Sequence, residues 1–238
     1  MSTFVLVHGA WHGGWAWSEV AQRLRRQGHE VHTPDLPGHG NDRTPISEIT
    51  LQAYADRVAS VIDQATQPVV LVGHSMGGVV ISQAAEVRPR AIKSLVYVCA
   101  FLLQDGQTLL QIADHDRDAC VLRNLVFAAD HRSAVLKPEV IREVFYGDCT
   151  PEVAEWAEKQ LNPQAAAPLA TPLRVTPENF ARIPRIYVEC LQDRAISMAV
   201  QREMYRAMPC REVFTLEASH SPMLSKPEEL TKILLAAA

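Results

Sequence analysis

A serine between glycines is the residue of this sequence with the clearest capacity for chemistry. Residues 69–78 read VVLVGHSMGG, so Ser75 stands in a Gly-x-Ser-x-Gly pattern directly after a run of apolar, mostly β-branched residues. Such a run predicts a strand buried on both faces, and the apolar spacing that follows the glycines predicts a helix. A sharp strand-to-helix turn holds its corner residue in a strained backbone conformation and lifts the side chain clear of the sheet. We therefore expect Ser75 to be a nucleophile.

A serine hydroxyl is a weak nucleophile at neutral pH, so it needs a histidine base and an acid that orients this histidine. Among the nine histidines, His220 lies four residues beyond the last predicted strand, at the same sheet edge as Ser75. Hydrolases built around this turn carry the serine, the acid and the histidine in that order. Asp193, just past the predicted strand 185–190, fits as the acid, and Asp105 is the alternative.

Acyl transfer also needs N–H groups that stabilise the developing oxyanion. The backbone N–H of Met76, the residue after the nucleophile, is one expected donor. The N–H of Ala10, in the glycine-rich loop after the first predicted strand, is the other. We expect Gly9, Trp11 and His74 to contact the substrate, with Gly9 allowing a close approach of the backbone.

Two other patterns could bind a metal ion, but neither keeps the residues that such a site requires. Residues 114–118 have the alternating acids of a calcium loop, yet Ala119 and Leu125 occupy the positions of the necessary glycine and glutamate. His8 and His12 are four residues apart, but the glycines around them disfavour the helix that would bring both to one metal. We therefore expect no metal site.

Short apolar runs and helical spacing alternate on both sides of the serine motif. The apolar runs predict strands at residues 4–7, 31–33, 69–72, 94–99, 185–190 and 212–216. This alternation is typical of an α/β fold with a mostly parallel, doubly wound sheet. Residues 104–184 show helical patches and no buried strand. We expect a single domain over residues 1–238, with a core of about 1–103 and 185–238 and a helical cap of about 104–184.

The composition excludes several classes of protein. A net charge of −4 and the absence of a long basic block give no surface for nucleic acid or anionic lipid. We expect no secretion signal and no membrane span, because no apolar stretch is long enough. Five widely spaced cysteines without a Cys-x-x-Cys pair suit a reducing cytoplasm. The expected partner is a small-molecule substrate, and a homodimer is left open.

Four segments of the chain resemble one known family. They are FVLVHGAWHGGW at residues 4–15, GHEVHTPDLPGHG at residues 28–40, GHSMGG at residues 73–78, and DRAI at residues 193–196 ahead of His220. These segments look like those of the α/β-hydrolase branch that contains plant methylesterases of the salicylic-acid-binding-protein type and hydroxynitrile lyases. The resemblance covers nearly the whole chain, which is identified as a bacterial-type esterase member of this branch.

The resemblance implies a fold, a site and a substrate class. The fold is the α/β-hydrolase fold, with its cap inserted after the equivalent of the sixth strand. The site is a triad of Ser75, His220 and Asp193, with an oxyanion hole from Ala10 and Met76. The substrates are small esters, and no cofactor is implied.

Two positions separate the esterases of this branch from its lyases. The lyases place a threonine where Gly9 stands and a lysine where Ser221 follows the expected base. Because both are missing, we expect an esterase that forms an acyl-enzyme, with hydroxynitrile lyase activity as an alternative. A thioesterase or lactonase would use the same residues. A ligand-binding protein that retains the hydrolase fold is an alternative of another class.

Overall fold

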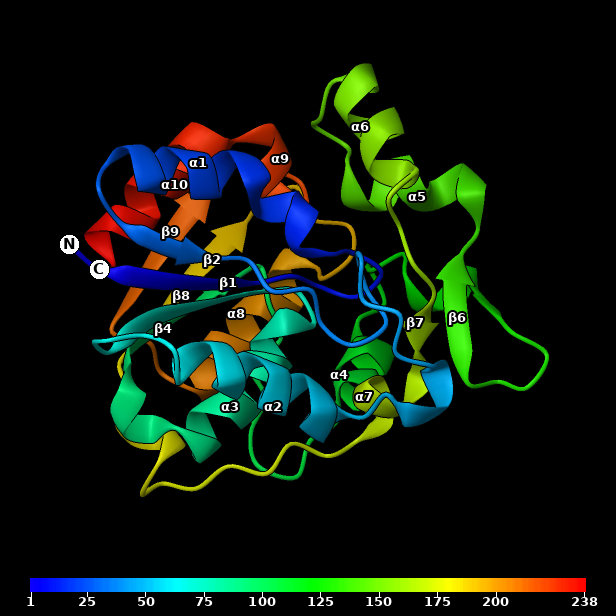
Figure 1. Ribbon diagram of the computed structural model, residues 1–238. Coiled ribbons are helices and arrows are strands. Elements are labelled where there is room, and N and C mark those ends of the chain that lie inside the picture. Colours follow the sequence, from blue (N-terminus) through cyan, green and yellow to red (C-terminus); the bar gives the residue numbers. More distant parts are fainter.

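Six parallel strands form one sheet at the centre of the molecule (Figure 1). The computed structural model describes residues 1–238. The strands are β1 (Thr3–Val7), β2 (Glu30–His32), β3 (Val69–His74), β4 (Ile92–Val98), β8 (Arg185–Cys190) and β9 (Glu212–Leu216). Their spatial order is β2-β1-β3-β4-β8-β9, and every neighbouring pair is parallel. The predicted doubly wound parallel sheet is confirmed, and β3, which leads into Ser75, lies inside it.

Helices cover both faces of this sheet (Figure 1). One face packs against α1 (Ser18–Arg26), α9 (Pro222–Ser225) and α10 (Pro227–Ala236), and the other against α2 (Leu51–Ile62), α3 (Gly77–Val87) and α8 (Met198–Ala207). Strand side chains alternate between the two cores, since Val5 and Val7 join one cluster while Phe4 and Leu6 join the other. No helix combines the length and the apolar character that a membrane crossing requires.

Residues 104–184 leave the sheet after β4 and form what we call the cap. Its elements are α4 (Leu109–His115), β5 (Leu125–Phe127), β6 (Ser133–Leu136), α5 (Pro138–Phe145), α6 (Pro151–Glu158), β7 (Gln164–Ala165) and α7 (Ala166–Ala170). Short 3-10 turns lie in the cap at Leu122–Asn124 and Phe180–Arg182, and in the core at Gly14–Trp17, Ile46–Glu48 and Pro89–Ala91. Cap residues such as Phe145 and Leu169 belong to the same apolar cluster as the sheet residues Val5 and Val7, so the cap has no separate core. The boundaries of cap and core stay a prediction.

The cap contains helices, as expected, and also three short strands that the sequence analysis did not predict, which form an antiparallel sheet in the order β5-β6-β7. These strands are two to four residues long. Val126 and Phe127 of β5 and Val135 of β6 are exposed. A strand of this kind contains no run of buried apolar residues, which is the pattern that marks β1, β3, β4 and β8 of the central sheet.

Candidate active site

Ser75 occupies a tight turn between β3 and α3. Its φ is 54°, in the left-handed region that non-glycine residues rarely adopt, as predicted for the corner of such a turn. The turn can be this tight because Gly77 has no side chain. A Cβ at Gly77 would lie 2.8 Å from the carbonyl oxygens of Val7 and His8. The flanking glycine therefore lets the turn pack against the end of β1.

His220 and Asp193 follow β9 and β8, which are neighbouring parallel strands, so both residues reach the same edge of the sheet. His220 Nδ1 lies 2.8 Å from Asp193 Oδ2, and both side chains are buried. A carboxylate accepts hydrogen bonds, so Nδ1 donates and Nε2 keeps its lone pair. Asp193 Oδ1 accepts from the N–H groups of Ala195 (2.7 Å) and Ile196 (2.9 Å). Asp105, the alternative acid, instead accepts from a backbone N–H of the cap segment.

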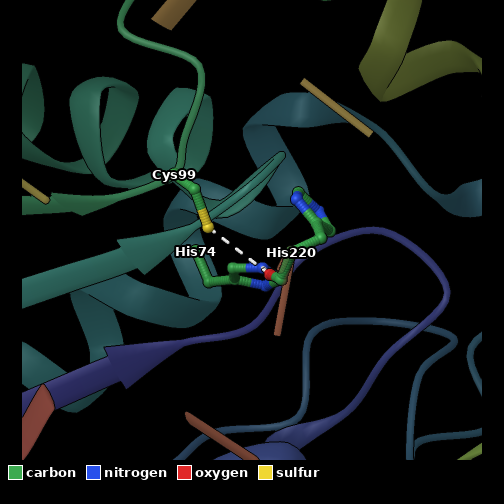
Figure 2. Close-up of side chains that lie close together, drawn as sticks. All are labelled: His74, Cys99 and His220. Carbon is green, nitrogen blue, oxygen red and sulfur yellow. Dashed lines mark hydrogen bonds between the residues drawn. The ribbon is translucent and has the colours of Figure 1, made fainter. Parts of the chain in front are cut away.

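His74 and Cys99 hold the main chain of His220 in place (Figure 2). His74 Nε2 donates to the carbonyl oxygen of His220 at 2.7 Å, and Cys99 Sγ donates to the same oxygen at 3.4 Å. Burial lowers the pKa of His74 well below its ordinary value and raises the pKa of Cys99 well above its own, so both are neutral. The side-chain ligand atoms of the three residues lie within 4.8 Å of one another, the spacing of a metal site. In this structure His74 and Cys99 use them as hydrogen-bond donors.

The placement of His74 does not fit the expected contact with substrate. His74 is 1% exposed and is not among the residues that line the cavity at Ser75. Gly9 is not among the lining residues either. A Cβ at Gly9 would lie 2.8 Å from Ser75 Cβ and 2.9 Å from His74 Nδ1. A glycine is required there because the backbone packs against these two residues. The expected contact of Gly9 with the substrate stays a prediction.

The two predicted oxyanion donors are free. Neither the Ala10 N–H nor the Met76 N–H makes a hydrogen bond within the protein. His8 orients the N–H of Ala10, a role that the sequence analysis did not predict. His8 Nε2 accepts from the Leu36 N–H (3.1 Å), so Nδ1 donates to the Gly9 carbonyl (2.8 Å). Because that carbonyl and the Ala10 N–H belong to one peptide group, His8 fixes the direction of the Ala10 N–H.

A small apolar cavity lies in front of Ser75. Of the 15 residues that line it, 14 are hydrophobic, and Ser75 is the polar exception. Its lining residues outside the cap are Ala10, Trp11, Met76, Phe101, Ala195 and Ile196. Those from the cap are Leu109, Leu110, Ala113, Val121, Leu122, Leu125, Phe145 and Leu169. Trp11 is one of the lining residues outside the cap, and its contact with substrate stays a prediction. A charged ligand group would lose its hydration here without gaining a partner.

Three hydrogen bonds, which we call the clasp, join the loop after β1 to the cap. Trp11 Nε1 donates to Ala134 O (2.9 Å), and Asn162 N–H donates to Trp11 O (2.8 Å). The Tyr146 hydroxyl donates to His12 Nε2 (2.9 Å), while His12 Nδ1 donates to a carbonyl of its own loop (2.8 Å). The loop that supplies the Ala10 N–H is therefore held by the cap as well as by the sheet.

Buried neutral histidines make the stability of the fold depend on pH. Burial lowers the pKa of His12 and of His39 from 6.5 to about 4, and holds the pKa of His8 and His74 well below 6.5. The unfolded chain takes up these protons as the pH falls through about 6.5, whereas the folded protein does not until about pH 4. The free energy of unfolding should therefore fall between about pH 6.5 and pH 4, by up to about 3 kcal/mol for each of His12 and His39.

Urea unfolding near neutral pH and at about pH 4.5 measures this loss. The variant His39→Gln should lose less stability on acidification than the wild-type protein. The matched control is His115→Gln, since His115 is exposed. An identical acid loss in the wild-type and His39→Gln proteins would contradict the prediction.

Comparisons with known proteins add three kinds of finding. A family model described as "Alpha/beta hydrolase family" matches residues 4–233. A pyrethroid hydrolase of Sphingobium wenxiniae is 32% identical over 98% of this chain and 86% of its own length, and methylesterase 7 of Arabidopsis thaliana is 32% identical over 98% and 94%. The crystal structure of a pyrethroid hydrolase from Sphingobium faniae superposes with a TM-score of 0.88 at 31% identity, over 99% of this chain and 96% of that one.

Proposed function

Because the chain belongs to the alpha/beta hydrolase family, we propose that it is a serine hydrolase that cleaves small carboxylic esters through an acyl-enzyme. Ser75 is the nucleophile, His220 the base and Asp193 the acid that orients it. The kinship with plant methylesterases predicted from the sequence is confirmed, and so is the prediction of an ester hydrolase. The residue roles are our proposal.

The mechanism follows from the hydrogen bonds of these residues. Asp193 accepts the Nδ1 proton of His220, which leaves Nε2 as the base. As Ser75 Oγ attacks the ester carbonyl, Nε2 takes the hydroxyl proton, and the free N–H groups of Ala10 and Met76 receive the oxyanion. His220 then gives this proton to the leaving alcohol. Water, deprotonated by the same imidazole, then attacks the acyl carbonyl. As the bond to Ser75 Oγ breaks, His220 returns the proton to Oγ and the acid is released.

One observation carries the proposal: the sole polar side chain on the cavity wall is a serine in a strained turn. The Ser75 hydroxyl does not stabilise the fold through a hydrogen bond, because Ser75 Oγ makes none within the protein. Ala10 and Met76, whose N–H groups are free, line the same cavity. This combination serves attack on a carbonyl group and has no evident role in stability.

The lining of the cavity favours neutral, apolar esters. Fourteen hydrophobic residues offer nothing to pair with a charged acyl or alcohol group. The names of the relatives, a pyrethroid hydrolase and a methylesterase, describe proteins that act on esters, and they support the same class for this chain.

A panel of substrates tests the proposal. Small methyl esters, thioesters, lactones and mandelonitrile are compared with a matched pair, p-nitrophenyl butyrate and the anionic p-nitrophenyl hemisuccinate. We expect kcat/KM for the butyrate to exceed that for the hemisuccinate by at least about 100-fold, the effect of burying an unpaired charge. Equal rates for the two esters would contradict the substrate class.

The same panel separates the alternatives. The lyase alternative predicts rapid cleavage of mandelonitrile, but Gly9 packs so closely on Ser75 that a threonine there would require the backbone to shift. A thioesterase or lactonase would show its highest kcat/KM with those substrates. A binding protein that keeps the fold would return the ester intact, and mass spectrometry of the bound ligand detects this.

Two further expectations belong to the proposal. All five cysteines are free, which supports a reducing compartment such as the cytoplasm. The partner we propose is the small-molecule ester itself. A homodimer stays an open prediction, which the molecular mass in solution tests.

A further inference from the structure

Gln201 is a fully buried polar side chain on α8, beside the acid of the proposed triad. Its Nε2 lies 3.3 Å from Asp193 Oδ2, 2.8 Å from Ile196 O and 3.4 Å from Cys190 O. Its Oε1 accepts from the Cys190 N–H at 3.1 Å. One amide group therefore joins the last residue of β8 to the turn after it and also contacts the carboxylate within that turn.

The two ends of this amide are not interchangeable. The Cys190 N–H can only donate and the Ile196 carbonyl can only accept, so the amide oxygen must face the first and the nitrogen the second. Of the two Nε2 protons, one therefore goes to Ile196 O, and the other is shared between Asp193 Oδ2 (3.3 Å) and Cys190 O (3.4 Å). The same carboxylate oxygen accepts from His220 Nδ1 at 2.8 Å.

The carboxylate of Asp193 is held on both of its oxygens. Oδ1 accepts from the backbone N–H groups of Ala195 and Ile196, whereas the donors to Oδ2 are the side chains of His220 and Gln201. Asp193 Oδ2 is meant to orient the His220 imidazole. Without Gln201, that imidazole would be the only side chain that donates to Oδ2. We propose that Gln201 is a positioning residue that holds the Asp193 carboxylate for His220, an inference that rests on the triad proposed above.

The chain contains a glutamine that serves as a matched control. Gln83 is buried on α3, where its Nε2 donates to Arg174 O (3.2 Å) and its Oε1 accepts from Arg174 N–H (3.2 Å). It bridges backbone groups, as Gln201 does, but its side chain makes no hydrogen bond to a residue of the proposed site. The same substitution at both positions separates a role in catalysis from a role in stability.

The experiment compares Gln201→Leu with Gln83→Leu in hydrolysis of p-nitrophenyl butyrate. We expect Gln201→Leu to lower kcat about tenfold with KM nearly unchanged, the effect of losing one hydrogen bond to a charged group. In this variant Asp193 Oδ2 has one donor fewer and holds the Nδ1 proton of His220 more tightly. The fall of kcat/KM on the acid side of its pH profile should therefore occur at higher pH. Gln83→Leu should lower Tm and leave kcat and the pH profile unchanged. If Gln201→Leu does not fold, Gln201→Met, which keeps the length of the side chain, gives the same readouts.

A double-mutant cycle with Asp193→Asn provides the decisive measurement. If Gln201 acts through the carboxylate, adding Gln201→Leu to Asp193→Asn should change kcat less than about twofold. A tenfold loss in both backgrounds, or a wild-type pH profile for Gln201→Leu, would overturn the inference. Ser75→Ala is assayed alongside: if it remains active, the proposed triad is wrong, whereas an inactive Ser75→Ala beside a normal Gln201→Leu removes only the role of Gln201.

Discussion

Ser75→Ala should lower kcat for p-nitrophenyl butyrate by about six orders of magnitude while the protein stays folded. Without the hydroxyl, no acyl-enzyme can form, and only water attack assisted by the N–H groups of Ala10 and Met76 remains. Stability should change little, because the Ser75 hydroxyl has no hydrogen-bond partner within the protein. Initial rates at high enzyme concentration measure the loss of kcat, and circular dichroism with a thermal scan checks the fold.

Ser82→Ala is the matched control for this substitution. Ser82 lies on α3, seven residues after the nucleophile, and its hydroxyl is buried between Gly78 O (2.7 Å) and the Tyr97 hydroxyl (2.8 Å). We expect this variant to lose stability and to keep the kcat of the wild-type protein. Turnover by Ser75→Ala within tenfold of the wild-type rate would rule out Ser75 as the nucleophile.

Gly9→Ala should lower kcat by about 100-fold with little change in KM. The added methyl group would lie 2.8 Å from Ser75 Cβ and 2.9 Å from His74 Nδ1. Cβ atoms in proteins essentially never come within 3.0 Å of other heavy atoms in this way. The backbone must move to relieve this contact, and the peptide that moves carries the Ala10 N–H. The developing oxyanion then loses one of its two donors, an effect confined to the transition state and worth about 3 kcal/mol.

Gly147→Ala makes the same chemical change where there is room for it. A Cβ at Gly147 would lie no closer than 3.4 Å to its nearest neighbour, Glu143 O, so activity and stability should stay near those of the wild-type protein. Steady-state kinetics of both variants separates the effect at Gly9 from a general intolerance of alanine. The oxyanion role of the Ala10 N–H is contradicted if Gly9→Ala keeps its kcat.

The central sheet could be predicted from the sequence because each of its strands leaves a local trace. β3 and β4 are buried on both faces, so their residues form continuous apolar runs. The order of Ser75, Asp193 and His220 along the chain then placed base and acid at one edge, where the structure brings His220 and Asp193 together. The cap strands leave no such trace, because β5 and β6 are short and partly exposed.

The supporting residues were missed for a different reason. His12 and Tyr146 are 134 positions apart in the chain, and no local pattern links partners so distant. His8 was weighed only as a metal ligand, because its bond to the Gly9 carbonyl depends on the fold of the loop. Gln201 did leave a trace: it falls between Val200 and Met204 on the buried side of α8. A glutamine on an apolar helix face needs buried partners, and that alone could have identified it.

The clasp restricts how the substrate range of this enzyme can evolve or be engineered. A chimera that grafts a relative's cap onto this core would have to supply new partners for Trp11 and His12, or the loop carrying the oxyanion donor would lose its support. Positions such as Leu109 and Val121 face the cavity and take no part in the clasp. Single substitutions on the cavity wall can therefore change the substrate range without altering the clasp, whereas exchange of the whole cap requires the clasp to be rebuilt.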